Sequence, residues 1–561
     1  MAPSISTLPP ELLIRICDFM QSKRDIANFF RSSRQFYAVA SPHLYRHVDL
    51  LSLPRFIFGY QTRDVAQDID ALIAAVVRDP HLAGLVKHLN VRLTDIRHDR
   101  SQNGRSLSPE QQELVKALLP DIPGSQARRF SGTPPPCHVN DDGSGSEWES
   151  ADDSADEDEL EAYDPDKAIP VFETEADRWI WLAQRSAAIR RNVILTILLS
   201  RLPNLERLDL EMPALGWRTG FLDRVIQRSK TGNPESPDSS PFLANLRRMC
   251  FGYTAPDQRG ECWIGAFVHP KLDSVYLHRL SGLGPSLSYL APRMLNITHL
   301  ELRDCRIAPP SLLRLLSSPK ALKTFIYVVG EVQTRAEHYM PISYKSIRAA
   351  LEKQKDSLEK IWLDYPHDYQ WDEASNQHTS PMSSFSTFNK LKYLRIAGTY
   401  IFGFVWTNEV DEGRLLRALP EQLETLHMTH ADEDEETLEG ISFVLDAKKR
   451  GRLQQLTELK FEAASTWYMG NRRELVRLFD LAKSVGLSIT LLDNHSDRRI
   501  EHPWQRRQAA LNFTQSAAYP RRESGWGFFG ETTWPRRVSG CMQIPIYDDI
   551  SDMWTGARQS S

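Results

Sequence analysis

Residues 205–210, LERLDL, decide the fold because the same spacing of apolar residues returns along most of the chain. Further copies of L-x-x-L-x-L, with Leu replaced in places by another apolar residue, start at 246, 272, 297, 322, 358, 391, 423 and 456. An imperfect copy, LVKHLNV, occupies 85–91. Helical patterns separate several copies: SLLRLLSS (311–318), SYKSIRAALEKQ (343–354), ETLEGISFVLDAKKRG (436–451) and RRELVRLFDLAKSVG (472–486). Strand, helix and strand in this order predict parallel strands joined by helical crossovers.

Stacked units of this kind form a curved solenoid, which makes the expected fold class α/β. The pattern resembles that of leucine-rich repeat proteins. Successive copies from 205 onward are 25 to 41 residues apart, and several of these steps exceed the usual range of about 20–29 residues, so we expect irregular repeats. A helix over about 173–201 is expected to cover the N-terminal end of the array.

Residues 8–50, LPPELLIRICDFMQSKRDIANFFRSSRQFYAVASPHLYRHVDL, predict three short helices. The first starts near residue 8, where Pro9 and Pro10 fit a first helical turn. Its predicted apolar face is Leu12, Leu13, Ile16, Phe19 and Met20. The second is expected around 25–30, and the third around 33–40, closed by Pro42. So small a unit cannot bury all of its apolar residues, which implies a partner surface.

This stretch resembles an F-box: an L-P-x-E opening, a Ser-Arg-x-Phe step and a closing Leu-aromatic pair all occur in register. The resemblance implies that a Skp-family adaptor, which joins such proteins to a cullin-RING ubiquitin ligase, docks on Leu8, Pro9, Leu12, Ile16, Ile26 and Phe30 or their neighbours. The alternative is a local helical subdomain that packs only on its own chain.

The rest of the chain divides by composition. Residues 141–166 hold 13 Asp or Glu and no Lys or Arg. Removing these from the total charge of −5 leaves +8 on the remainder. Such a run cannot bury enough apolar surface to offset its chain entropy, so we expect a disordered acidic insertion over 98–172. The expected domains are the F-box (1–50), a linker with a first irregular repeat (51–97), the insertion, the leucine-rich-repeat solenoid (173–495) and an irregular C-terminal tail (496–561).

Side chains between the core positions of each strand should line the concave face of the sheet. On this argument the face shows Asp209, Tyr276, His278, Glu301, Arg303, Trp362, Asp364, Arg395, His427 and Lys460. Aromatic and guanidinium groups are enriched in binding hot spots. We therefore expect a protein substrate to contact Tyr276, His278, Arg303, Trp362, Arg395 and His427.

Composition narrows the function. The 561 residues include six cysteines without a C-x-x-C pair, which predicts reduced, mostly buried thiols and no metal site. No phosphate-binding glycine loop, nucleophile elbow or H-E-x-x-H motif occurs, so we expect no enzymatic activity and no cofactor. The basic residues form no continuous stripe, which disfavours nucleic acid as a ligand. The longest apolar run is too short to cross a membrane, and the N-terminus does not resemble a secretory signal. A cytoplasmic or nuclear protein is expected.

These patterns together predict a substrate-recognition adaptor of an SCF-type ubiquitin ligase. Its F-box would bind the Skp-family adaptor, and through it a cullin, while the repeats present an unidentified protein substrate. The alternative is a non-catalytic leucine-rich-repeat scaffold that binds partners without promoting their ubiquitination.

Overall fold

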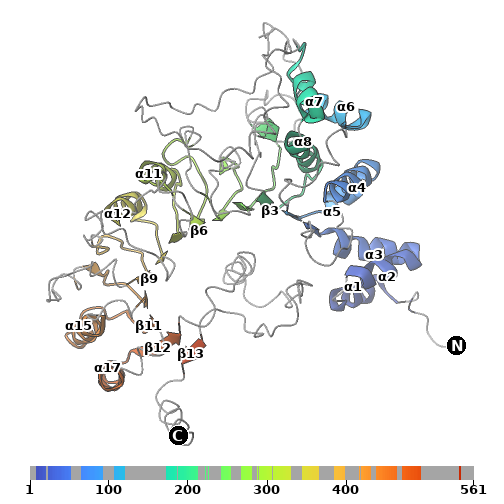
Figure 1. The fold of residues 1–561 in the computed structure, drawn as a ribbon. Coiled ribbons are helices and arrows are strands. Elements are labelled where there is room, and N and C mark those ends of the chain that lie inside the picture. The colour runs from blue at the N-terminus through green and yellow to red at the C-terminus, as the bar shows by residue number, and fades with distance from the viewer. Residues whose placement is uncertain are drawn as a thin grey trace, which may run out of the picture.

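The computed structural model describes the chain in segments. These are residues 5, 8–20, 23–51, 65–92, 106–119, 172–185, 187–212, 221–222, 225–226, 242–253, 267–278, 280, 287, 290–305, 307–329, 344–364, 384–397, 416, 418–430, 437–463, 471–493 and 542–544. A helical bundle at the N-terminus adjoins a curved array of strands with helices outside it (Figure 1). Within these segments, no helix is both long and apolar enough to span a bilayer.

Three helices form the bundle: α1 (Pro10–Phe19), α2 (Lys23–Ser32) and α3 (Arg34–Tyr45). The Ser33 hydroxyl caps α3 by accepting a hydrogen bond from the Phe36 amide at 3.2 Å. Contrary to the prediction, Pro42 lies inside α3. The helix continues because proline removes only one amide donor, and the Pro42 carbonyl still accepts the Arg46 amide at 3.0 Å.

The core of the bundle corrects the predicted face of α1. Leu13 and Cys17 are its buried residues, and they pack with Ile26, Phe36, Val39 and Ala40. Phe19, which the prediction placed on the same apolar face as Leu13, has 83% of its surface exposed. The buried stripe of α1 is therefore rotated relative to the predicted one.

Within the described segments, the strands form one 13-stranded sheet whose spatial order follows the chain. Twelve neighbours run parallel: β1 (His47–Leu51), β2 (His88–Arg92), β3 (Arg207–Met212), β4 (Arg248–Tyr253), β5 (Ser274–His278), β6 (His299–Cys305), β7 (Thr324–Val329), β8 (Lys360–Asp364), β9 (Tyr393–Ala397), β10 (Thr425–Thr429), β11 (Glu458–Ala463) and β12 (Ser488–Asp493). The last strand, β13 (Met542–Ile544), pairs antiparallel with β12. The predicted parallel solenoid is confirmed.

The repeat motif explains where each strand begins. Its first apolar residue, such as Leu205 or Leu246, is fully buried and ends a tight turn, because its amide donates to the carbonyl three residues earlier. The strand starts two residues later. The second and third apolar residues then point into the core, as Leu208 and Leu210 do in β3. The residues between them face the concave side by strand alternation.

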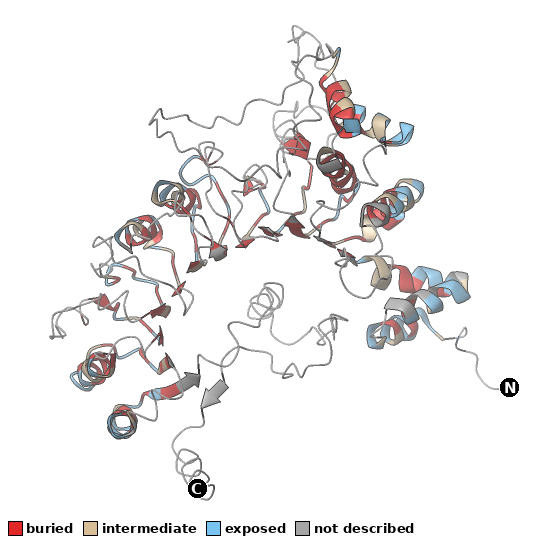
Figure 2. Cartoon of the chain, in the orientation of Figure 1, coloured by how far each residue is buried: buried red, intermediate tan, exposed pale blue. Residues whose placement is uncertain are grey.

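Helices cover the convex side of the sheet, and buried residues concentrate where they meet the strands (Figures 1 and 2). They are α4 (Val65–Arg78), α5 (Pro80–Leu85), α6 (Pro109–Leu118), α7 (Glu175–Arg185), α8 (Ala187–Ser200), α11 (Pro309–Ser317), α12 (Tyr344–Leu351), α15 (Thr437–Lys449) and α17 (Arg472–Ser484). A short 3-10 turn, η6 (Glu352–Gln354), extends α12. The helix predicted over 173–201 is two helices, α7 and α8.

The structure also revises three predicted boundaries. Strand β1 follows α3 directly, so the solenoid begins inside the predicted 1–50 unit. Helix α6 lies inside the predicted insertion; a capping box on Ser108 starts it, and Val115 anchors it in the core. Strand β13 falls in the predicted irregular tail. The acidic run 141–166 lies outside the described residues.

The edge of the sheet where the strands begin carries lateral ion pairs between repeats. Lys87 lies 2.6 Å from Glu206, Lys323 lies 3.4 Å from Glu359, and Lys392 lies 2.8 Å from Glu424. Each exposed pair stabilises the fold by at most about 1 kcal/mol. Because the pairs join residues of adjacent strands, they favour the observed stacking order of the repeats.

Candidate partner-binding surfaces

Helix α1 presents an apolar stripe to solvent. Leu12 is 48% exposed and Phe19 is 83% exposed, and their separation of seven residues places them on the same face of the helix. Ile5 and Ile14 are also exposed, at 47% and 42%. Large apolar side chains exposed on a short helix and just before it are typical of a surface that a partner covers.

The predicted adaptor-binding residues divide into surface and core. Pro9 and Leu12 are exposed, while Leu8 and Ile16 are half-buried against the bundle core. Ile26 is a core residue at 6% exposure, so it supports the surface from beneath. The side chain of Phe30 lies outside the described residues. Sequence reasoning placed Phe19 on the same face as Leu12 but did not include Ile5, Ile14 or Phe19 among the adaptor-binding residues.

The bundle is joined to the solenoid without a linker. Arg46, the residue between α3 and β1, accepts hydrogen bonds at its carbonyl from the amides of Lys87 (3.1 Å) and His88 (2.9 Å). The Tyr37 hydroxyl of α3 donates to Asp79, which caps α5, at 3.4 Å. These contacts fix the orientation of the exposed face of α1 relative to the concave sheet.

Strand register confirms the predicted concave positions. Trp362 of β8 pairs with Ile326 of β7 and Arg395 of β9, and its chain neighbours Ile361 and Leu363 are buried in the core. The same lateral row contains Asp209, Tyr276, Glu301, His427 and Lys460. The predicted concave residues therefore belong to one face, and they lie on seven of the nine strands from β3 to β11.

A cluster of charges, the concave ion cluster, joins β8 to β11. It consists of Asp364, Arg395, His427, His430 and Glu462. The Arg395 guanidinium lies 2.9 Å from Asp364 and 3.0 Å from Glu462, whose side chains are 5% and 0% exposed. His430 Nε2 lies 3.1 Å from Asp364, and His427 Nε2 lies 2.9 Å from Glu462. Arg395 of β9 thus pairs with two buried carboxylates, one on the adjacent strand β8 and one on β11, two strands away.

Histidine protonation follows from this burial. Burial, and next the Arg395 guanidinium, lower the pKa of His427, although Glu462 acts in the opposite direction. Its other ring nitrogen lies 3.0 Å from the Tyr393 hydroxyl. Burial also raises the pKa of Tyr393 to about 12. A neutral His427 therefore links a neutral tyrosine to a carboxylate, an arrangement that orients all three side chains.

Trp362 lies between two guanidinium groups. The Arg395 carbon Cζ is 4.1 Å from the centre of the ring and that of Arg303 is 4.5 Å away, within range of cation–π attraction. The indole nitrogen donates to Asp364 at 3.4 Å. Trp362 is accordingly half-buried, and neighbouring cations cover part of the ring that the sequence suggested would be bare.

A second, smaller ion cluster lies on β6. Glu301 is 2% exposed and pairs with Arg303 and His299. Burial alone would raise the pKa of Glu301, but Arg303 and His299 lower it below the usual value. The Tyr276 ring lies beside His299, with 4.9 Å between ring centres. The carboxylate therefore remains charged and fixes Arg303 beneath the exposed part of Trp362.

The structure corrects the expected exposure of the concave face. Tyr276, His278 and His427 are only 6%, 4% and 4% exposed, and the arginines are 15% (Arg303) and 11% (Arg395) exposed at the side chain. Side chains on adjacent strands lie about 4.8 Å apart, so they pack and pair with one another. The sequence identified the positions but not these lateral contacts. It also missed Tyr393 and Glu462, which complete the clusters.

Buried thiols were predicted, and Cys17, Cys250 and Cys305 are buried thiols that take part in no disulfide. The remaining cysteines lie outside the described residues. In the part of the chain that the structure describes, no group of three or more His, Cys, Asp or Glu side chains is arranged to hold a metal ion.

Comparison with known families agrees with both halves of the structure. The F-box-like family matches residues 5–51, which include α1 to α3 and β1. The leucine-rich repeat domain family matches residues 264–462, from before β5 into β11. No curated protein matches the chain significantly. The strands before β5 and after β11 continue the same register, so the repeat array extends beyond the matched segment. The chain thus contains an F-box-like domain and a leucine-rich repeat domain.

Proposed function

We propose that this protein is the substrate receptor of an SCF-type ubiquitin ligase, with the F-box bound to a Skp-family adaptor and the repeat array bound to a protein substrate. The exposed Leu12–Phe19 stripe on a domain of the F-box-like family carries the proposal. A role in the ubiquitin system would place the protein in the cytoplasm or nucleus.

The mechanism we propose is proximity. The protein would supply no reacting group; it would hold a substrate close to the transferring enzymes, which converts an encounter between separate molecules into a reaction within one complex. The contacts of Arg46 and Tyr37 support this role, because they couple the bundle to the first repeats. A rigid coupling keeps the distance from adaptor to substrate constant.

Within the concave face, we propose that Trp362 and Arg303 contact the substrate. Both keep part of their surface accessible and combine an aromatic ring with a guanidinium, the chemistry of binding hot spots. We assign a supporting role to Tyr276, His278, Arg395 and His427, because pairing and burial hold their polar groups within the sheet.

The test is adaptor binding by the full chain with Leu12→Ala and Phe19→Ala combined. Burying a large apolar side chain stabilises by about 1.5–3 kcal/mol. Weighted by the exposed fractions of 48% and 83%, the two truncations should cost about 3 kcal/mol, or about 100-fold in Kd. Leu313→Ala is the matched control, because Leu313 is a 39% exposed leucine on α11.

Affinity for the purified Skp-family adaptor should fall for the double variant and stay constant for the control. Equal adaptor binding by both variants would contradict the assignment of the stripe. Recovery of a cullin with the wild-type chain, together with ubiquitination of a captured protein, separates a ligase receptor from a scaffold that only binds partners.

A further inference from the structure

The edge where β1 to β4 begin carries a surplus of positive charge next to the F-box. Five cations, Arg46, Lys87, Arg207, Arg247 and Arg248, form what we call the strand-start patch. Register aligns Arg207 with Arg248, and the edge residues Arg46, Lys87, Glu206 and Arg247 follow one another through backbone hydrogen bonds. The patch therefore crosses four adjacent strands.

Two carboxylates neutralise part of this charge. Glu206 lies 2.6 Å from Lys87, and Asp209 lies 2.6 Å from Arg207. In the described part of the chain, Arg46, Arg247 and Arg248 have no carboxylate within ion-pair distance. Arg46 and Arg247 are exposed, and Arg248 is half-buried. Three guanidinium groups thus remain available to an anionic ligand.

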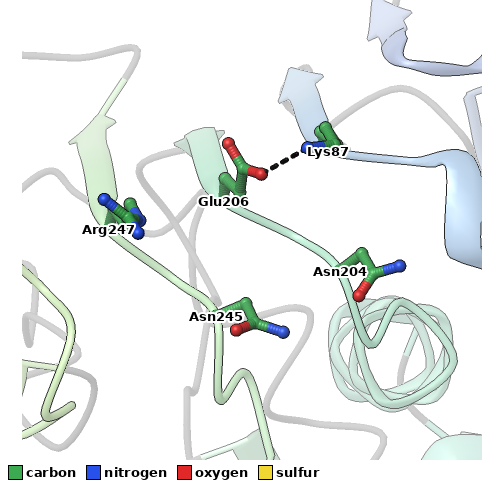
Figure 3. Close-up of a pocket in the computed structure, with 5 residues that line it drawn as sticks. All are labelled: Lys87, Asn204, Glu206, Asn245 and Arg247. Carbon is green, nitrogen blue, oxygen red and sulfur yellow. Dashed lines mark hydrogen bonds and ion pairs between the residues drawn. The ribbon is translucent and has the colours of Figure 1, made fainter.

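A polar pocket of about 260 Å³ opens between the turns that precede β2, β3 and β4 (Figure 3). It is lined by Lys87, Asn204, Glu206, Asn245 and Arg247. Its asparagines are fixed, because Asn204 donates to the Gly84 carbonyl at 2.8 Å and Asn245 to the Pro203 carbonyl at 2.9 Å. Its walls are therefore held in place by contacts between repeats, and its volume exceeds that of a carboxylate group.

The charge environment of His88 supports a positive potential here. Burial is the largest cause of its pKa of about 3, and His47 and the guanidinium groups of Arg207, Arg46 and Arg248 lower it further. His88 therefore stays neutral at physiological pH. The net charge that a ligand meets comes from the arginines and Lys87.

We propose that the strand-start patch binds an acidic, Asp- or Glu-rich segment of a partner protein. The spacing fits an extended peptide that crosses the strands. Four strands about 4.8 Å apart span about 14 Å, and alternate side chains of an extended peptide lie about 7 Å apart. Two or three carboxylates on one side of such a peptide can contact the strand-start patch together. A single anionic group would contact only a few of the cations in the patch.

The identification of this partner as the substrate rests on the proposed function. The patch adjoins the F-box through Arg46, so an acidic segment bound there would lie at the adaptor end of the solenoid. The segment would be held by charge and the remainder of the substrate by the concave face. Charge complementarity would also accelerate association, in a salt-dependent way.

The test measures binding of a fluorescent peptide of alternating Glu and Ser to the full chain by anisotropy, against a peptide with Gln in place of Glu. Arg247→Gln and Arg248→Gln are combined in one variant. The matched control combines Arg473→Gln and Arg477→Gln, which removes two exposed charges from α17. Arg247→Gln alone provides a variant whose exposed position cannot affect folding of the core.

We expect the Glu peptide to bind and the Gln peptide not to bind. The Arg247 and Arg248 variant should lose about tenfold in affinity, and the control should lose less than twofold. Raising the salt concentration from about 50 to about 200 mM should weaken binding of the Glu peptide to the wild-type chain. Equal binding of both peptides, no measurable binding, or equal losses in the two variants would overturn the proposal.

Two further measurements separate the alternatives. Adaptor binding should be unchanged in the Arg247 and Arg248 variant, so loss of peptide binding with intact adaptor binding isolates the patch from the F-box. A peptide with the sequence of residues 141–166 tests the chain's own acidic run. If it binds, and if deleting 141–166 raises affinity for the Glu peptide by more than tenfold, the occupant is that run and the partner-protein proposal is overturned.

Discussion

Replacing Arg395 by Met should destabilise the C-terminal half of the solenoid more than any other single change on the concave face. Arg395 is the cation between Asp364 and Glu462, whose side chains are 5% and 0% exposed. Methionine keeps apolar contact with Trp362 but removes the Arg395 guanidinium from both carboxylates. Breaking a buried ion pair from one side costs about 3–5 kcal/mol, and we expect about 4 kcal/mol here.

The measurement is unfolding in urea followed by circular dichroism, with Arg473→Met on the exposed side of α17 as control. A repeat array can unfold in more than one step, so the shift should be read in the transition that includes β8 to β11. Adding Glu462→Gln should recover part of the loss, because the double variant leaves one fewer buried charge. A loss below about 1 kcal/mol, or strict additivity with Glu462→Gln, would refute the view that these groups form one electrostatic unit.

Three further predictions concern local contacts. Gln354 is buried and bonds three backbone groups of the preceding repeat, at 2.8, 2.9 and 3.0 Å, so Gln354→Met should cost about 2–4 kcal/mol in urea unfolding; a neutral result would contradict this. Gly451 has a φ of +89° and Gly84 does not have a positive φ, so Gly451→Ala should lower stability by about 1 kcal/mol while Gly84→Ala, in helix α5, should not. The pKa of His88 falls from 6.5 to about 3 on folding, so between these values the unfolded chain binds a proton that the folded chain does not. The free energy of unfolding should therefore fall as pH drops below about 6.5. His88→Gln should reduce the dependence of this free energy on pH between about pH 6.5 and pH 4, and an unchanged dependence would count against burial of a neutral ring.

The F-box illustrates what sequence reasoning reached and where it stopped. Pro9 and Pro10 were enough to place the start of α1, because prolines fit a first helical turn. The predicted start of the third helix at residue 33 agrees with α3, which Ser33 caps. The rotation of α1 was not predictable in the same way. Cys17 and Phe19 have similar apolar character, and only the packing against α2 and α3 buries the first and exposes the second.

The sequence by itself determined the solenoid. The L-x-x-L-x-L copies specify both a turn and the alternation of a strand. Both are local properties, so they can be recognised without the rest of the chain. Strands β1, β12 and β13 were not predicted, because they lack the complete motif. Helix α6 was not predicted, because it lies between segments of loop composition. Its capping box and Val115 were the local signals that could have indicated it.

Only the tertiary structure decided which charges meet. Lys87 and Glu206 are 119 residues apart, and Asp364 and His430 are 66 apart, yet each pair is in contact because stacking brings repeats that are one or two strands apart close together. The same stacking turned a predicted open row of aromatic and basic side chains into buried ion clusters, and gathered Arg46, Arg247 and Arg248 on one edge. Which side chains meet across repeats depends on the number of residues in each crossover, because this number sets the register between neighbouring strands. No local pattern in the sequence encodes that register.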